Sequence, residues 1–500
     1  MGLALLPGMV AAAPGDFTQT AKLTASDGAA LDHFGWSVAT AGDRVVVGAP
    51  DDDDGGSTSG STYVYEPDGT GDYTETKVTA SDAVPGDSFG WSVATAGDRI
   101  VVGAYGDDDA GDLSGSGYVY EPNGTGGFTE TKLTASDAAD NDQFGRSVAT
   151  AGDRIVVGAF GGGFSGAAYV YEPDGTGSYT ETKLTPSDAP DSARFGWSVA
   201  TAGDRIVVGA HLGDEQGAAY VYGPDGAGGY TETKLTASDG AALDFFGYSV
   251  GIAGDRIVVG AYGNDDAGNH SGSAYVFEPD ANGGYSETKL TASDAADGDI
   301  FGNAVATAGG HIVIAAHNSD DGGSNSGAAY VYEPDGNGGY TETKLTASDA
   351  ADGDIFGYAV ATAGDRIVVG APSDDDGGNA SGSAYVFEAD DLGCTVTGTD
   401  GDDVLRGGPG DIVCGGEGND RLRGGDGSQT FHGGPGDDTL LGESDHDILH
   451  GGPGNDTLKG GSGNDQLNGE AGDDPPQRRL RQGHPRRRAR HRPTRRRRRT

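Results

Sequence analysis

One dipeptide constrains the fold of this 500-residue chain more than any other feature. Phe-Gly recurs seven times, at intervals of 55, 55, 51, 51, 55 and 55 residues, at Phe34, Phe89, Phe144, Phe195, Phe246, Phe301 and Phe356. The residues around each copy repeat as well, so the chain is a tandem array of similar units. A unit of about 50 residues buries its apolar face against its neighbours, which is how repeat architectures build a core.

Each unit has the pattern of four short strands. In the first unit the expected strands are residues 36–40, 44–49, 62–66 and 73–79. Ala-Gly-Asp and Pro-Asp-Gly stand between strands and favour tight hairpin turns. The second strand is continuously apolar, as in a strand buried on both faces, whereas the third and fourth strands alternate. The predicted fold class is therefore all-β.

The two ends of the array predict a closed ring. The last unit stops after its third strand, while residues 17–24 (FTQTAKLT) have the sequence of a fourth strand. Seven four-stranded units suit a β-propeller, in which radial closure leaves no long exposed edge. We expect a seven-bladed β-propeller over residues 17–391, with residues 17–24 completing the last blade.

Charge and composition exclude several classes of protein. The chain has 78 Asp and Glu against 32 Lys and Arg, a net charge of -46, and such an acidic surface repels nucleic-acid phosphates. It has no run of about 18 apolar residues, so no membrane span is expected. Residues 475–500 contain 13 of the basic residues and no acid, which leaves 19 basic against 78 acidic residues in the rest.

The repeats resemble a known family. Phe-Gly-x-Ser-Val-Ala followed by Gly-Ala-Pro, as at Gly48–Pro50 and Gly370–Pro372, is similar to the FG-GAP repeat of integrin α-chain propellers and bacterial surface proteins. That resemblance implies a binding or adhesion platform. Integrin-type blades often hold calcium in an Asp-rich loop between the first two strands, but Thr40–Asp43 forms only a tight turn here, so that site is not expected.

A second domain is expected at residues 392–474. From Gly398 onward the chain falls into nonapeptides of the form G-G-x-G-x-D-x-U-x, which resemble the haemolysin-type (RTX) calcium repeat. The resemblance implies a parallel β-roll with two nonapeptides per coil and Ca²⁺ as the bound ion. Glycine permits the tight turns, Asp supplies the hard oxygen ligands that calcium prefers, and the eighth residue fills a thin core.

Two nonapeptides per coil separate the odd turns from the even turns. The odd turns are intact at position six, with Asp403, Asp420, Asp438, Asp456 and Asp474. The even turns are irregular: the second is one residue short, Gln429 replaces Asp, and Asp445 replaces the Gly that should precede Asp447. Only Asp465 lies in a fully regular even turn. We expect calcium mainly along the odd side, with Asp447 and Asp465 as ligands on the even side.

Cys394 and Cys414 are the only cysteines and are separated by about one coil. They can meet across adjacent layers as a disulfide, or remain two free thiols.

One face of the propeller is expected to carry two kinds of feature. Asp-rich loops, such as Asp51–Asp54, suit either the capture of cations or basic partners or a solvated acidic surface. The residue after Phe-Gly is aromatic in five units, where it either stacks on a sugar ring or packs between blades. These residues are Trp36, Trp91, Trp197, Tyr248 and Tyr358.

The two ends of the chain lie outside these domains. Residues 1–16 resemble a truncated signal peptide, with a disordered leader as the alternative. Residues 475–500 are expected to be an Arg-rich disordered tail. One permitted back-translation of this tail, shifted by one base, continues the nonapeptide register, so a frameshift product is favoured over a nucleic-acid or membrane arm.

The sequence contains no recognisable catalytic constellation. The leading hypothesis is an extracellular or cell-surface calcium-binding protein, not an enzyme, whose propeller binds a surface protein or polysaccharide. The alternatives are an extracellular hydrolase or lyase built on the propeller and a structural surface-layer component.

Overall fold

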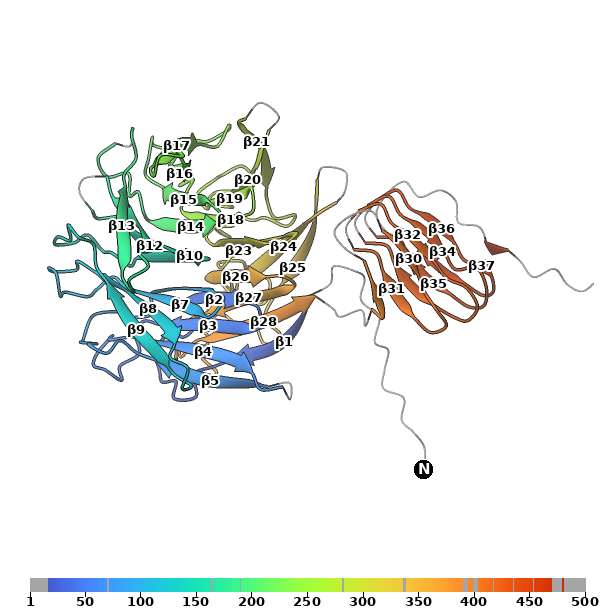
Figure 1. Cartoon of the computed structure of the whole chain (residues 1–500), viewed down its shortest axis with the longest axis horizontal. Helices are drawn as coiled ribbons and strands as arrows, with labels where there is room; N and C mark the ends of the chain where they lie inside the picture. The colour runs from blue at the N-terminus through green and yellow to red at the C-terminus, as the bar shows by residue number, and fades with distance from the viewer. Residues whose placement is uncertain are drawn as a thin grey trace, which may run out of the picture. The chain divides into compact units, whose positions relative to one another are not determined.

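A computed structural model describes residues 17–480, except 70–71, 163–164, 189, 281–282, 336–338, 390–393, 399–402, 417, 435, 453 and 470–478. The chain divides into two compact units, a propeller and a C-terminal roll, and every described secondary-structure element is a strand (Figure 1). The all-β prediction is confirmed. The segment predicted as a signal peptide, residues 1–16, lies outside the described residues.

The propeller consists of seven four-stranded antiparallel sheets. The first strands are β2 (Ser37–Ala41), β6 (Ser92–Ala96), β10 (Ser147–Ala151), β14 (Ser198–Ala202), β18 (Ser249–Ala253), β22 (Val305–Ala308) and β26 (Ala359–Ala363). The second strands are β3 (Arg44–Ala49), β7 (Arg99–Ala104), β11 (Arg154–Ala159), β15 (Arg205–Ala210), β19 (Arg256–Ala261), β23 (His311–Ala316) and β27 (Arg366–Ala371). The third strands are β4 (Ser61–Pro67), β8 (Ser116–Pro122), β12 (Ala167–Pro173), β16 (Ala218–Pro224), β20 (Ser273–Pro279), β24 (Ala328–Pro334) and β28 (Ser383–Ala389). The fourth strands are β5 (Tyr73–Val78), β9 (Phe128–Leu133), β13 (Tyr179–Leu184), β17 (Tyr230–Leu235), β21 (Tyr285–Leu290), β25 (Tyr340–Leu345) and, for the seventh blade, β1 (Phe17–Leu23).

The ring closes by pairing the start of the array with its end. β1 runs antiparallel to β28, with Phe17 opposite Ala389 and Leu23 opposite Ala384. Leu23 is buried in the apolar cluster that joins the seventh blade to the first. The blade that ends the array therefore takes its fourth strand from the beginning of the array.

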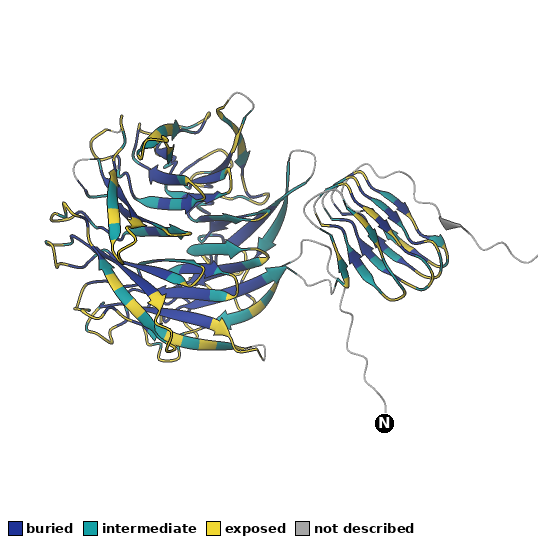
Figure 2. Cartoon of the chain, in the orientation of Figure 1, coloured by how far each residue is buried: buried dark blue, intermediate teal, exposed yellow. Residues whose placement is uncertain are grey.

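The propeller core lies between the blades rather than within them. Seven apolar clusters each combine one blade with the next, and the second strands are buried along almost their whole length (Figure 2). Between blades 1 and 2, Val46 and Val64 pack with Phe89, whose ring meets that of Tyr118 edge-on at 5.4 Å. The continuously apolar pattern of the second strand reflects this burial on both faces.

Close approach of backbones explains the recurrent glycines. A Cβ on Gly48 of blade 1 would lie 2.0 Å from the carbonyl oxygen of Gly90, the Phe-Gly glycine of blade 2. Gly90 itself has a φ of +90°, and a Cβ there would lie 2.3 Å from the carbonyl oxygen of Ser61. Only glycine allows both the backbone conformation and this contact. The Phe-Gly and Gly-Ala motifs are thus two sides of one interface between blades.

The roll stacks short parallel strands in two columns. One sheet contains β29 (Val396–Thr397), β31 (Ile412–Cys414), β33 (Thr430–His432), β35 (Ile448–His450) and β38 (Gln466–Asn468). The other contains β30 (Val404–Arg406), β32 (Arg421–Arg423), β34 (Thr439–Leu441) and β36 (Thr457–Lys459). Their eighth-position side chains form one thin core of Val413, Leu422, Phe431, Leu440, Leu449 and Leu458. The predicted β-roll is confirmed.

One further strand pair lies near the end of the roll. β37 (Gly461–Ser462) pairs in parallel with β39 (Arg479–Leu480), whose two residues fall within the segment predicted as a disordered tail. Backbone groups at the open end of a roll can pair with any extended chain, whatever its side chains. Residues 475–478 and 481–500 lie outside the described residues.

Candidate calcium sites and axial ligand face

The sixth-position aspartates of the roll form ladders through the backbone. On the odd side, the amide of Asp420 donates to Asp438 Oδ1 at 2.7 Å, and the amide of Asp438 donates to Asp456 Oδ1 at 2.8 Å. On the even side the amide of Gln429 donates to Asp447 Oδ1 at 2.9 Å. Each coil therefore orients the carboxylate of the next coil.

The remaining predicted ligands continue these ladders. Asp403 donates its amide hydrogen to Asp420 Oδ1, and Asp447 donates its own to Asp465 Oδ1. Asp420, Asp438, Asp447, Asp456 and Asp465 are buried, and Asp403 is half-buried. Asp474 lies outside the described residues.

The second carboxylate oxygen supplies the test of fit for a cation. Oδ2 of Asp438 and Oδ2 of Asp447 are buried and have no hydrogen-bond partner. A Cβ on Gly433 would lie 2.3 Å from Asp438 Oδ2 and 2.3 Å from the carbonyl oxygen of Gly451. Buried oxygens without donors are costly, and carboxylate and carbonyl oxygens are the ligands that calcium prefers. The donor set and the glycine-lined space fit Ca²⁺.

The electrostatics of the two aspartate ladders also favour a cation. Burial, together with the charges of Asp456 and Asp420, raises the pKa of Asp438 to about 8. Burial and the charge of Asp465 also raise the pKa of Asp447. Like charges stacked in a poorly hydrated column repel one another, and a divalent cation removes that repulsion.

The even side retains more oxygen ligands than its irregular sequence suggests. Gln429, which stands where an Asp was expected, buries its Oε1 atom without a partner, while its Nε2 donates to the carbonyl of Asp426. An amide oxygen is also a calcium ligand type. From the sequence, Gln429 was predicted only to be an irregular residue of its turn. Its amide side chain was the signal that could have identified it as an oxygen ligand.

Cys394 and Cys414 form a disulfide in the first coil, with their Cα atoms 5.9 Å apart. The bond joins the start of the roll to β31. A disulfide here constrains the turn that is one residue short.

Lysine ammonium groups lie among the carboxylates of the acidic propeller loops. In blade 2, Lys132 Nζ lies 2.7 Å from Asp82, 2.8 Å from Asp107 and 2.6 Å from Asp109. The hydroxyl of Tyr118 contacts Asp82 and Asp107, and the ammonium lies 5.2 Å from its ring centre. The three carboxylate oxygens are close enough to share one metal ion, but the lysine ammonium lies among them.

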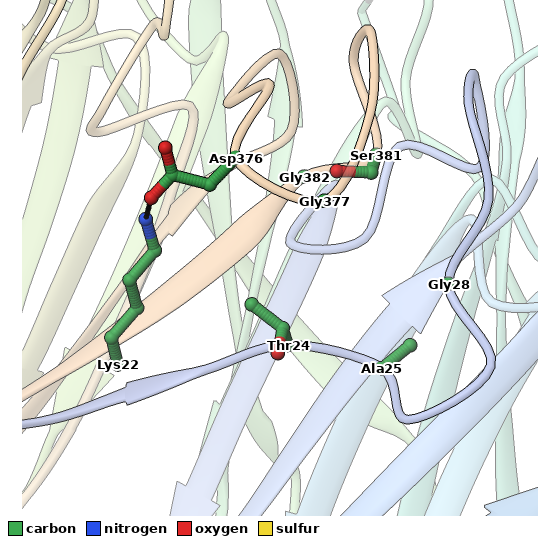
Figure 3. A pocket seen from close by; sticks show the side chains of 8 residues that line it. All are labelled: Lys22, Thr24, Ala25, Gly28, Asp376, Gly377, Ser381 and Gly382. Atoms are coloured by element: carbon green, nitrogen blue, oxygen red, sulfur yellow. Dashed lines mark hydrogen bonds and ion pairs between the residues drawn. The ribbon is translucent and has the colours of Figure 1, made fainter.

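The seventh blade repeats this arrangement with a lysine from the other end of the array. Lys22 of β1 lies 2.7 Å from Asp349, 2.9 Å from Asp374 and 2.6 Å from Asp376. Figure 3 shows the pair of Lys22 and Asp376, both of which line a pocket of about 330 Å³. Blade 3 differs, because Asp137 is the one carboxylate among the described residues that pairs with Lys183.

The residues after Phe-Gly meet one another around the propeller axis. The ring of Trp36 lies 4.6 Å from that of Trp91 and 4.5 Å from that of Tyr358, and Trp197 lies 5.4 Å from Tyr248. All five predicted aromatic residues are partly exposed, so they both pack between blades and present ring surface.

One residue at the position after Phe-Gly was not predicted from the sequence to belong to this ligand face. Arg146 occupies the same position in blade 3, and its guanidinium carbon lies 4.4 Å from the ring centres of both Trp91 and Trp197. The signal was present in the sequence, because Arg146 is the only charged residue among the seven that follow Phe-Gly.

Comparison with known proteins agrees with this geometry. The FG-GAP repeat matches residues 17–65, 73–120, 128–171, 179–222, 230–277, 285–332 and 340–387. The chain belongs to the FG-GAP repeat family. Each FG-GAP segment runs from the fourth strand of one blade into the third strand of the next, so the repeat is offset from the blade by one strand. That offset is why β1 must complete the last blade.

The roll matches the RTX calcium-binding nonapeptide repeat at residues 395–411, 415–449 and 441–474. The chain is thus an FG-GAP propeller followed by calcium-binding RTX repeats. Within the described residues, no helix is long and apolar enough to cross a membrane.

Other comparisons add little. No curated protein matches the chain. One solved structure, a candidate 6-phosphogluconolactonase from Bacteroides fragilis, shares 10% identity and covers 63% of this chain and 85% of its own, with a TM-score of 0.40. So low a score supports no inference about this FG-GAP protein.

Proposed function

We propose that this protein works outside the cell or on its surface, where calcium folds the RTX roll and the FG-GAP propeller acts as a binding or adhesion platform. The observation that carries the calcium part is the contrast between the two domains. The propeller's acidic clusters contain lysine ammonium groups, whereas Asp438 and Asp447 of the roll each bury a carboxylate oxygen without a partner.

This contrast makes the roll depend on calcium and the propeller independent of it. An unneutralised carboxylate column opposes folding, and a ligand that binds only the folded state stabilises it by mass action. Calcium concentrations are low in the cytosol and high outside, so the roll would fold after export. The disulfide between Cys394 and Cys414 supports an oxidising location.

Calcium titration of the full chain tests the switch. Circular dichroism and limited proteolysis should show a propeller that is resistant in EGTA and a roll that becomes resistant only when calcium is added. A roll that is already protected in EGTA would refute the proposal.

Paired variants test which side binds the ion. Asp438→Asn together with Asp456→Asn should lower the calcium stoichiometry measured by calorimetry, and Asp447→Asn should lower it less. Asp437→Asn is the matched control, since Asp437 is exposed at position five of the same nonapeptide. Equal stoichiometry in the double variant and the control would exclude the odd side.

The aromatic face supports the binding role of the propeller. Trp36, Trp91 and Trp197 offer partly exposed indole rings at one position of the repeat, as surfaces that stack on sugars do. Binding to polysaccharide and host-surface arrays, measured with calcium and with EGTA, tests this role. A protein that binds nothing on such arrays in calcium would favour a structural role.

A further inference from the structure

Two arginines of the propeller, Arg146 and Arg194, lack the carboxylate partners that the other described lysines and arginines of this domain have. Among the described propeller residues, every lysine and every other arginine pairs with an Asp or a Glu. No ion pair within that part of the chain involves Arg146 or Arg194. The chain has a net charge of -46, so carboxylates are abundant. That none of the described ones pairs with Arg146 or Arg194 therefore sets these two side chains apart.

Aromatic rings lie beside both guanidinium groups. Arg146 lies between Trp91 and Trp197, and Arg194 lies 5.4 Å from the ring centres of Trp197 and Phe160. Stacking stabilises a planar cation but supplies no hydrogen-bond acceptor to its edge. Each guanidinium has five N–H donors in a fixed fork that matches a carboxylate, and both side chains are partly exposed.

The surroundings of the pair are desolvated and low in acid. Burial, together with the charges of Arg194 and Arg146, lowers the pKa of His211 to about 3, so His211 stays neutral beside them. The loop after β11 in blade 3, residues 160–166, has no acidic residue. In blade 4, Asp214 pairs with Lys234, which leaves Glu215 as the other acid of that loop.

We propose that Arg146 and Arg194 bind the carboxylate of a uronic-acid residue in an acidic saccharide, whose ring packs on the neighbouring indoles. This inference rests on the platform role proposed above and specifies its ligand. The acidic clusters elsewhere on the propeller oppose a long, densely charged polymer, so the site suits a short segment of uronic-acid residues. The aromatic rings beside the guanidinium groups favour a sugar over an isolated anion.

The two ligands of the test share their sugar rings and differ at the carboxyl group. Trigalacturonate and its methyl ester present the same sugar rings with and without carboxylates. The full chain in calcium should bind trigalacturonate with an affinity that falls as salt is added, and the methyl ester about ten- to a hundredfold more weakly, because charged hydrogen bonds are lost. The only three tryptophans are Trp36, Trp91 and Trp197, so a change in tryptophan emission places the ligand at this face.

The protein variants separate charge from stacking. Arg146→Gln should reduce affinity for trigalacturonate by about tenfold or more and leave methyl-ester binding unchanged, while Arg146→Lys should restore part of the loss. Arg154→Gln is the charge-matched control, since Arg154 already pairs with Glu172.

Three outcomes would overturn the inference. If both sugars bind equally and Arg146→Gln changes neither, the platform role stands and carboxylate recognition is wrong. If neither sugar binds while neutral glycans bind on arrays, the ligand class is wrong. If an acidic peptide shifts tryptophan emission and trigalacturonate does not, the site binds protein carboxylates instead.

Discussion

Replacing the lysine of an acidic cluster tests whether its ammonium group stabilises the propeller by neutralising the neighbouring carboxylates. Lys132 is the best position, because its ammonium contacts Asp82, Asp107 and Asp109 within 2.8 Å. The side chain of Asp107 is only 4% exposed, whereas those of Asp82 and Asp109 are 40% and 66% exposed. Lys132→Met keeps most of the volume and removes the charge, so one buried carboxylate loses its counter-ion.

The expected cost follows from that burial. Removing one partner of a buried ion pair costs about 3–5 kcal/mol, and the partial exposure of this cluster favours the lower end, about 3 kcal/mol. With an unfolding entropy of about 2.1 cal/mol/K per residue, a cooperative propeller of this size would lose about 4 °C in Tm. Calcium can then take the place of the ammonium, and at about ten times its Kd it would restore about 1.4 kcal/mol, roughly 2 °C.

Differential scanning calorimetry in EGTA and in calcium measures the loss of Tm and its restoration by calcium. The wild-type protein, measured in the same two conditions, shows the effect that calcium has through the roll. Lys183→Met is the matched control, because Asp137 is the one described carboxylate that Lys183 pairs with, and both side chains are at least 35% exposed. Such a pair contributes less than about 1 kcal/mol, so this variant should shift Tm by about 1 °C or less and show no calcium rescue. Equal Tm losses in the two variants would refute the argument from burial.

Three further predictions concern other parts of the chain. Burial alone would lower the pKa of His311, but hydrogen bonding to Glu333 raises it above the ordinary value of 6.5. This stabilisation is complete below pH 6.5 and is lost as the pH rises through the folded-state pKa, so His311→Arg should flatten the fall in Tm between pH 5.5 and 8.5. Deleting residues 1–24 removes β1 from the last blade and should abolish the cooperative thermal transition. The deletion leaves β28 without its neighbouring strand and removes Leu23 from the apolar cluster between the seventh and first blades. Leu440→Ala in the thin core of the roll should cost about 2–5 kcal/mol and raise the calcium concentration needed for protection from proteolysis.

Local patterns in the sequence determined the architecture. The seven Phe-Gly copies set the number of blades, strand periodicity gave four strands in each, and the missing last strand identified residues 17–24 as its replacement. The nonapeptide spacing likewise gave the two columns of the roll and the positions of its aspartates. These features depend on short-range spacing and on turn residues, which a single sequence displays directly.

Only the tertiary structure decided the electrostatics. Lys132, Asp82 and Asp107 belong to three separate segments, and nothing in their spacing shows that the ammonium lies among the carboxylates. The contacts of Arg146 with Trp91 and Trp197 are equally hidden in the sequence, because the three residues come from three different blades. Charge interactions depend on distance and burial after the ring has closed. The sequence therefore showed how much charge the protein has, and the fold determined which charges are neutralised.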